Sequence, residues 1–214
     1  MLETSPLNRP DPGWLAACPA VVRFAGGSAG CLVVPLREVG LEHALAAGWS
    51  GVRDLALQRA GLGDVAAPDY VWRVTGPSLP DLPTETVDIA AIDELLGRTD
   101  AREPLFIRTQ CSTETLHHAF HVPRDFAWFA GHFPGDPILP GIAQVRLAIN
   151  SGRVLLGHAG QPRAIKQLKF KVPIRPDHVV ALNLQRLDGG ATVLFSLRSA
   201  SGEHASGRLD YAAP

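Results

Sequence analysis

Cysteine is scarce in this sequence, where Cys18, Cys31 and Cys111 are the three examples in 214 residues. Their number is odd and their spacing is wide, so they form neither a disulfide framework nor a zinc-binding pattern. We therefore expect each of them to be a small core side chain in a protein of the reducing cytoplasm, without a bound metal.

The sequence also lacks long apolar runs and an excess of either charge. No run approaches the ~18 apolar residues that span a bilayer, and the segment from Met1 to Pro6 lacks the basic and apolar regions of a signal peptide. Lys and Arg total 20 and Asp and Glu total 21, which gives a net charge of −1. This balance indicates neither nucleic acid nor an anionic membrane as a partner.

What the sequence does contain predicts two globular domains of the α+β class. Hydrophobic residues make up 46% of the chain, which is enough for ordinary packed cores. Changes in composition divide the chain into a leader, a small α+β domain, a charged linker and a larger domain, at 1–18, 19–97, 98–104 and 105–214.

The small domain shows a β-β-α-β-α order. A Gly-rich turn separates two short apolar runs, which predicts a hairpin, and a helical pattern follows that Gly48 and Gly51 interrupt. The expected strands are 20–24, 31–36 and 70–74, and the expected helices are 41–60 and 88–97.

The larger domain begins with two predicted strands, 106–111 and 116–122, and a loop rich in Phe, Gly and Pro. Pro140 suits the first position of a helix that reaches about Leu156 and is apolar on nearly every side, so we expect this helix to be buried. Apolar residues then alternate over 168–174, 180–184 and 193–197, before a last strand at 203–211. The pattern predicts an antiparallel sheet wrapped around one buried helix.

The loop before this helix carries a long composite motif. It reads Phe-Ala-Gly-His-Phe-Pro-Gly-Asp-Pro-Ile-Leu-Pro-Gly-Ile-Ala-Gln over 129–144. This string resembles the Gly-His-Phe-Pro-Gly and Pro-x-x-Pro-Gly motifs of the hot-dog-fold 3-hydroxyacyl-thioester dehydratases, and 169–176 is similar to a downstream strand of that family. The Pro-Gly-Ile-Ala-Gln start of the helix is most similar to dehydratase domains of the aryl-polyene type. The resemblance covers about 105–211.

The resemblance implies a lyase with a hot-dog fold and no cofactor. Its substrate would be a 3-hydroxyacyl chain on an acyl carrier protein or coenzyme A, in fatty-acid, aryl-polyene or pigment synthesis. It also implies a homodimer, or a heterodimer with another hot-dog subunit, because relatives build the site at the dimer interface.

Dehydration of a 3-hydroxyacyl thioester needs a base for the α-proton, an acid for the hydroxyl and donors for the thioester oxygen. His132 suits the base because imidazole titrates near neutral pH, although it could simply form hydrogen bonds within the loop. In relatives, the backbone amide of the glycine that matches Gly141 binds the thioester oxygen. The resemblance also implies that other motif residues bind substrate, namely Phe133, Pro134, Gly135, Ile138 and Leu139.

One position departs from the family pattern. Relatives carry Glu or Asp one turn into the helix, where this chain has Arg146, and arginine cannot protonate a leaving hydroxyl. The site could be inactive, use another acid such as Asp136 or a water, or receive a carboxylate from a second subunit. Arg146 itself could bind substrate or carrier phosphate, or be an ordinary ion-paired helix residue.

The alternatives to a dehydratase are therefore a non-catalytic thioester-binding or scaffold subunit of a hot-dog heteromer, and a hot-dog thioesterase. Three histidines on a predicted strand, His117, His118 and His121, lack acidic or cysteine partners at ligand spacing, so we expect no metal site there. Trp128 and Phe129 would line an acyl tunnel or pack in the core.

The small domain carries a second resemblance. The Leu-Pro-x-Leu-Pro-x-x-x-Val-Asp run at 79–88, followed by Ile92, Leu95 and Leu96, is similar to the end of the C-terminal lid of adenylate-forming acyl ligases. Glu85 and Thr86 stand where that family has Gly-Lys, so we predict no adenylation activity. The alternative is an unrelated small α+β domain.

Overall fold

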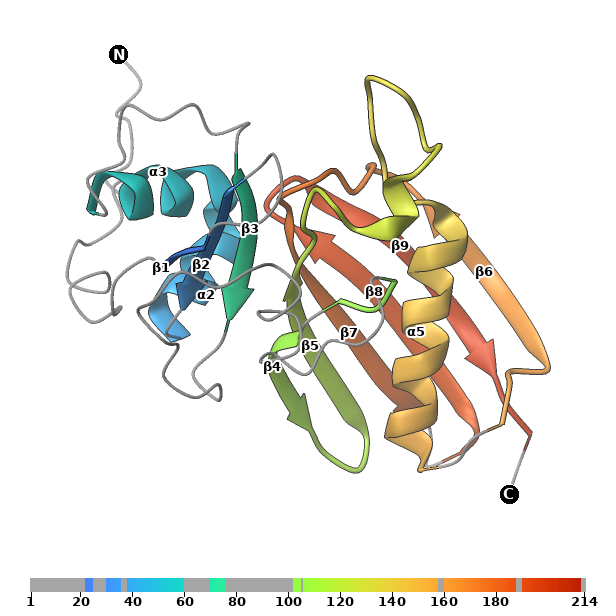
Figure 1. Cartoon of the computed structure of the whole chain (residues 1–214). Helices are drawn as coiled ribbons and strands as arrows, with labels where there is room; N and C mark the ends of the chain where they lie inside the picture. Colours follow the sequence, from blue (N-terminus) through green and yellow to red (C-terminus); the bar gives the residue numbers. More distant parts are fainter. Residues whose placement is uncertain are drawn as a thin grey trace, which may run out of the picture.

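The structure is a computed structural model, and it describes most of the larger domain and several secondary-structure elements of the smaller one (Figure 1). The described ranges are 22–24, 30–35, 38–59, 70–75, 102–104, 106–157, 160–187 and 190–212. These ranges contain two sheets, one of three strands and one of six.

The three-stranded sheet has the order β1-β2-β3, with bounds Val22–Phe24, Gly30–Pro35 and Tyr70–Thr75. Strands β1 and β2 are antiparallel, as the predicted hairpin requires, whereas β3 runs parallel to β2. The predicted 41–60 helix is two helices, α2 (Glu38–Ala47) and α3 (Trp49–Arg59). The break lies at Gly48, whose φ of 95° suits a residue without Cβ. The expected 88–97 helix and the lid-like 79–96 segment lie outside the described residues.

The six-stranded sheet has the order β4-β5-β7-β8-β9-β6, and every neighbouring pair is antiparallel. The strands are β4 (Phe106–Cys111), β5 (Thr115–His121), β6 (Ala164–Phe170), β7 (Val179–Leu187), β8 (Thr192–Ser199) and β9 (Gly202–Asp210). The predicted antiparallel sheet is therefore confirmed.

Cys111, at the end of β4, is a free and exposed thiol, so the expectation of a core cysteine is wrong at this position.

Helix α5 (Gly141–Leu156) lies along one face of this sheet (Figure 1). It begins one residue later than predicted, with Pro140 as the capping residue whose carbonyl accepts the amides of Ala143 and Gln144. Leu147 and Ala148 of the helix join Leu116, Phe120 and other sheet residues in one buried cluster. A curved antiparallel sheet packed on one long helix is the hot-dog arrangement that the resemblance implied.

The expectation that α5 is buried on all sides is wrong. Its sheet-facing side is buried, but Ile142 and Val154 on the opposite side are 66% and 63% exposed. The sheet covers only one side of the helix, so the apolar residues on the other side remain open in a single chain.

The alternating 168–174 run also differs from the prediction of one long strand with a buried face. Strand β6 ends at Phe170 and occupies an edge of the sheet, where it pairs with β9 alone. Leu168 and Phe170 are 40% and 51% exposed, while Ile174 lies in the core beyond the strand. An edge strand has no neighbour to cover its outer side, so alternation does not bury its apolar residues.

The smaller domain covers the opposite face of the sheet at β5. Residues Ala119 and His121 point away from α5, yet both are buried. The Trp49 ring lies 5.2 Å from the His121 ring, and Arg108 of β4 forms ion pairs with Glu38 and Glu42 of α2. The sheet is thus covered on both faces at β5.

Among the described helices, none is long and apolar enough to cross a membrane.

Candidate active site

The predicted motif forms a loop closed by backbone hydrogen bonds between the short 3-10 helix η3 (Ala127–Phe129) and α5. The amide of Ile138 donates to the carbonyl of His132 over 2.7 Å, and the amide of His132 donates to the carbonyl of Phe129 over 3.0 Å. Figure 1 shows this loop projecting beyond the sheet at the amino end of α5. Its base is fixed to the core, while its tip is open to solvent.

His132 lies at the start of this loop and is partly exposed. Its Nδ1 lies 3.0 Å from the carbonyl oxygen of Ala130. A carbonyl only accepts hydrogen bonds, so this contact requires the proton of a neutral ring to be on Nδ1. The lone pair is then on Nε2, for which the described part of the chain offers no partner, and this is the atom that a general base would use.

The amino end of α5 supplies hydrogen-bond donors close to the loop. Ala143 and Gln144 donate to Pro140, while the amides of Gly141 and Ile142 have no acceptor one helical turn earlier. These amides and the helix dipole favour a partially negative oxygen at this end. The Phe170 ring of β6 lies against Gly141, where an added Cβ would come within 2.7 Å of the ring.

The other predicted substrate-binding residues differ in how far they are exposed to solvent. Phe133, Pro134 and Gly135 are exposed at the tip of the loop, with Phe133 at 59%. Ile138 is half-buried, and Leu139 packs in the core with its amide bonded to the carbonyl of Ile174. The loop tip therefore offers an apolar surface to a partner or ligand, while Leu139 anchors the loop.

Asp136, which we considered as a substitute acid, is paired with Arg175. The Arg175 guanidinium holds the pKa of the Asp136 carboxyl below its usual range. A carboxyl that stays ionised at neutral pH has no proton to give, so Asp136 is a poor candidate for the missing acid.

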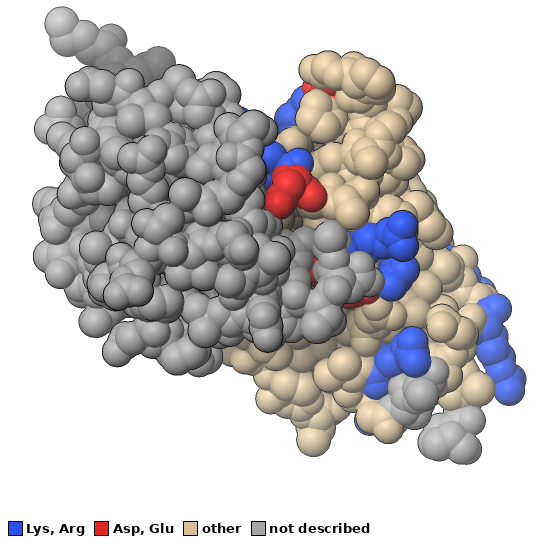
Figure 2. Space-filling model, viewed as in Figure 1, with Lys and Arg blue, Asp and Glu red and all other residues tan. Residues whose placement is uncertain are grey.

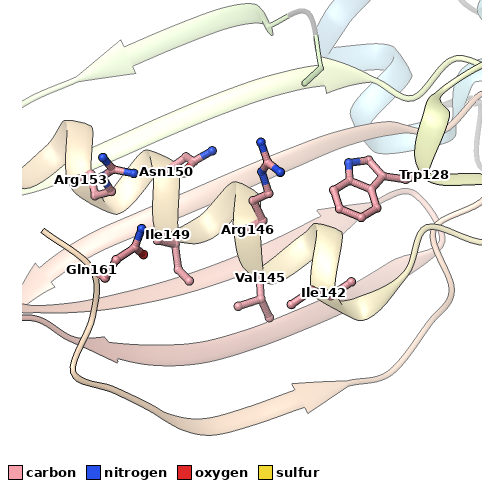
Figure 3. Close-up of a pocket in the computed structure, with 8 residues that line it drawn as sticks. All are labelled: Trp128, Ile142, Val145, Arg146, Ile149, Asn150, Arg153 and Gln161. Atoms are coloured by element: carbon pink, nitrogen blue, oxygen red, sulfur yellow. The ribbon is translucent and has the colours of Figure 1, made fainter. Parts of the chain in front are cut away.

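A groove of about 490 Å³ runs along the open side of α5 (Figure 3). Ile142, Val145 and Ile149 line one side of it. A polar row formed by Arg146, Asn150 and Arg153 lies along the other side, with Trp128 beyond Arg146 (Figure 3). Figure 2 shows several basic side chains on this face of the larger domain. The groove therefore suits an elongated ligand with apolar parts and oxygen-bearing groups.

Arg146 is exposed in this groove, as the sequence pattern placed it, but its partner was not expected. Its Nη2 lies 3.1 Å from Oε1 of Glu103, in the predicted linker. Its guanidinium carbon is also 5.9 Å from the centre of the Trp128 ring, a cation–π distance. Glu103 is 43 residues away in sequence, and no motif in the loop or helix pointed to it.

The three histidines of β5 have structural partners. His117 contacts Asn183 through Nδ1 at 2.8 Å, and His118 contacts Thr109 at 2.8 Å while stacking on Phe106. Burial lowers the pKa of His118 to about 4. His121 lies 3.7 Å from the Asp177 carboxylate. Within the described ranges, no three His, Cys, Asp or Glu residues come together as metal ligands would.

The ApeI-like family, described as ApeI dehydratase, matches residues 108–208. The 3-hydroxyacyl-(acyl-carrier-protein) dehydratase FabZ of Novosphingobium aromaticivorans is 29% identical over 107 residues, which cover 44% of this chain and 68% of the relative. The protein of the same name from Caulobacter vibrioides is 23% identical over 141 residues, which cover 59% and 87% of the two chains.

A solved structure described as the dehydratase heterocomplex ApeI:P from Xenorhabdus doucetiae is 22% identical and has a TM-score of 0.48. It is matched over 51% of this chain and 98% of that one. The sequence matches cover the His132 loop and helix α5, and the antiparallel sheet around that helix has the expected fold. Residues 108–208 therefore lie in a hot-dog domain that is similar in sequence to the 3-hydroxyacyl-acyl-carrier-protein dehydratases.

Proposed function

We propose that this protein dehydrates 3-hydroxyacyl thioesters, carried on an acyl carrier protein or coenzyme A, in the synthesis of fatty acids, aryl polyenes or related pigments. The observation that carries the proposal is the contact between Nδ1 of His132 and the carbonyl oxygen of Ala130. The Ala130 carbonyl accepts from Nδ1, so a neutral ring keeps its lone pair on Nε2. Similarity to the dehydratases supports the reaction class, and the contact with Ala130 supports His132 as the base.

In the proposed reaction, Nε2 of His132 removes the proton from C2 of the acyl chain. The electron pair of that C–H bond forms the C2–C3 double bond, and the C3–O bond breaks. The thioester oxygen, which gains negative charge, accepts a hydrogen bond from the amide of Gly141. Because Arg146 cannot release a proton, the imidazolium of His132 returns its proton to the departing hydroxyl, which leaves as water.

A second hot-dog subunit, either a copy of this chain or a related one, would complete the site. The support is the group of exposed apolar side chains on α5, β6 and the loop tip: Phe133, Ile142, Val154, Ile165, Leu168 and Phe170. Neighbouring apolar side chains with this degree of exposure mark an interaction surface. A partner on this surface would also cover the groove and exclude water from the thioester.

Turnover with synthetic substrates tests the proposal. The purified chain is incubated with 3-hydroxyacyl-pantetheine and 3-hydroxyacyl-carrier-protein thioesters, and the enoyl product is measured by mass spectrometry. His132→Ala should lower kcat about 10²- to 10⁴-fold, the usual contribution of a general base. His43→Ala, which changes a histidine on α2, should leave the rate unchanged. The proposed activity would be excluded if the wild-type chain alone gave no enoyl product and its addition to a FabZ-type dehydratase gave no more product than that dehydratase alone.

A second function, a non-catalytic thioester-binding subunit, is favoured by one observation. Arg146 occupies the position where relatives carry the acid, and because arginine cannot release a proton, α5 has no acid at that position. This alternative predicts that thioesters bind but are not converted, and that His132→Ala does not alter the cellular phenotype.

A further inference from the structure

The segment just before β4 lies against the open side of α5. Trp128 donates its indole N–H to the carbonyl oxygen of Arg102 over 2.9 Å, and Pro104 is buried. The Arg102 guanidinium carbon is 6.0 Å from the Trp128 ring, which therefore has two guanidinium groups near it. Residues 102–104 precede the region that the family model matches, so the family pattern assigns them no role.

These contacts bring the Glu103 carboxylate to the polar row of the groove. Its Oε1 lies 3.1 Å from Arg146 Nη2 and 3.4 Å from Asn150 Nδ2. Arg146 and Asn150 are one helical turn apart, and both line the groove (Figure 3). A carboxylate is thus present one turn into α5, where the family pattern expects an acid, but a different segment supplies it.

A contribution to folding stability does not explain why Arg146 and Glu103 form an ion pair. The side chains of Arg146 and Glu103 are 45% and 36% exposed, and ion pairs with that exposure contribute little to folding. The pair does fix the direction of the guanidinium, which Trp128 also restrains. A guanidinium carries five N–H donors, so one that is bound to a single carboxylate oxygen still offers donors to a ligand.

We infer that Glu103 is a specificity-determining residue that recognises the 3-hydroxyl group of the substrate, an inference that rests on the proposed function. The ionised carboxylate accepts the hydrogen bond of the hydroxyl, and Arg146 donates to the hydroxyl oxygen. Together they satisfy both the donor and the acceptor of an alcohol. An acyl chain without the hydroxyl would leave these groups unpaired, and such sites reject the analogue strongly.

Binding of two matched probes tests this inference. The probes are amide analogues of 3-hydroxyacyl-pantetheine and of acyl-pantetheine with the same chain length, neither of which is a thioester, and calorimetry gives both Kd values. The wild-type chain should prefer the hydroxylated probe at least tenfold. Glu103→Gln and Arg146→Gln should each reduce that preference to less than threefold, whereas Glu103→Asp should keep part of it.

The control variant is Glu114→Gln, in the exposed β4–β5 turn, which should keep the full preference. The double variant with Glu103→Arg and Arg146→Glu restores a carboxylate on α5 and keeps both charges, so it should also retain most of the preference. Thermal unfolding of each variant shows whether the fold is retained.

The inference is overturned if the wild-type chain binds both probes equally or neither, or if Glu103→Gln keeps the preference. Its failure can be told apart from that of the proposed function. Preference that depends on Glu103, without any enoyl product from thioesters, would mean recognition of the 3-hydroxyl without dehydration. If enoyl product forms, and neither its yield nor the preference between the probes changes when Glu103 is replaced, the proposed dehydratase activity stands. Glu103 is then not part of its site.

Discussion

Buried imidazoles in this domain are held in their neutral form by their surroundings. His118 is 6% exposed, and its ring stacks on Phe106 with the ring centres 3.9 Å apart. Burial lowers its pKa to about 4. Burial also lowers the pKa of His178 to about 4, assisted by the charges of His204 and Arg175. His132 differs because it lies on an open loop and is partly exposed.

The buried histidines predict how stability depends on pH. An unfolded histidine titrates near pH 6.5, so between about pH 6.5 and 4 the unfolded chain binds protons that the folded chain does not. The contribution of these histidines to stability is therefore fully present above pH 6.5 and is lost as the pH falls toward 4. We expect His118 to contribute up to about 1 kcal/mol per pH unit to that loss.

Urea denaturation at half-unit steps from pH 7.5 to 4.5 measures this dependence, and His118→Asn should have a flatter profile than the wild-type chain. His43→Ala, which changes a partly exposed histidine on α2, provides the comparison. A His118→Asn profile as steep as that of the wild type would contradict the assignment.

At the scale of elements, α5 is fixed by a close contact with the end of β9. The Tyr211 hydroxyl donates to the carbonyl of Ile149 over 3.0 Å, and the tyrosine ring lies over Gly152. A Cβ added at Gly152 would be 3.2 Å from Cζ of the ring and closer still to the hydroxyl. Tyr211 is buried, so its ring has little space to move.

Gly152→Ala should therefore lower the free energy of unfolding by about 1–3 kcal/mol, the usual cost of overpacking a core. Gly51→Ala is the matched control because it is also inside a helix, and an added Cβ there meets no atom within 4 Å. It should raise the free energy of unfolding by about 0.5–1 kcal/mol, since alanine favours the helix. Urea titration measures both changes, and an equal effect of the two substitutions would exclude the contact with Tyr211 as the cause.

Most elements of the larger domain could be predicted from the sequence because each has a local cause. The alternation of Leu116, His118 and Phe120 defines one face of β5, and Pro140-Gly141 defines the start of α5. The exposure of β6 could not be predicted, because alternation is the same in edge and central strands. The burial of His121 also depends on a distant residue, Trp49, which approaches it only in the folded chain.

Part of the candidate site could also be predicted from the sequence, and part could not. The motif located His132 and Gly141, and counting from the motif located Arg146. Glu103 could not be found by counting, because its contact with Arg146 joins segments that are far apart in sequence. The linker boundary drawn at 98–104 remains a prediction, although residues 102–104 contact the helix rather than simply connecting two domains.

At the scale of the whole molecule, the exposed apolar side chains of α5 and β6 predict association. We expect the purified chain to have the mass of two chains by light scattering, with β6 and the open side of α5 at the contact. Ile165→Lys on β6 and Val154→Lys on α5 should each shift the mass toward one chain, because a buried lysine without a partner is costly. Ile165 is 41% exposed and Val154 is 63% exposed, so neither change should disturb the core.

Thr113→Lys, in the exposed turn between β4 and β5, is the control and should leave the mass unchanged. A wild-type chain that remains monomeric at concentrations of tens of micromolar would contradict pairing between copies.

The two borders of the six-stranded sheet differ in how they are covered. One border of the sheet is β4, which carries the ion pairs of Arg108 with the acids of α2 and is in contact with β3. The other border, β6, has no such cover within the described part of the chain. We therefore expect subunits to join at β6 alone, which would give a closed pair related by a twofold axis rather than an open fibre.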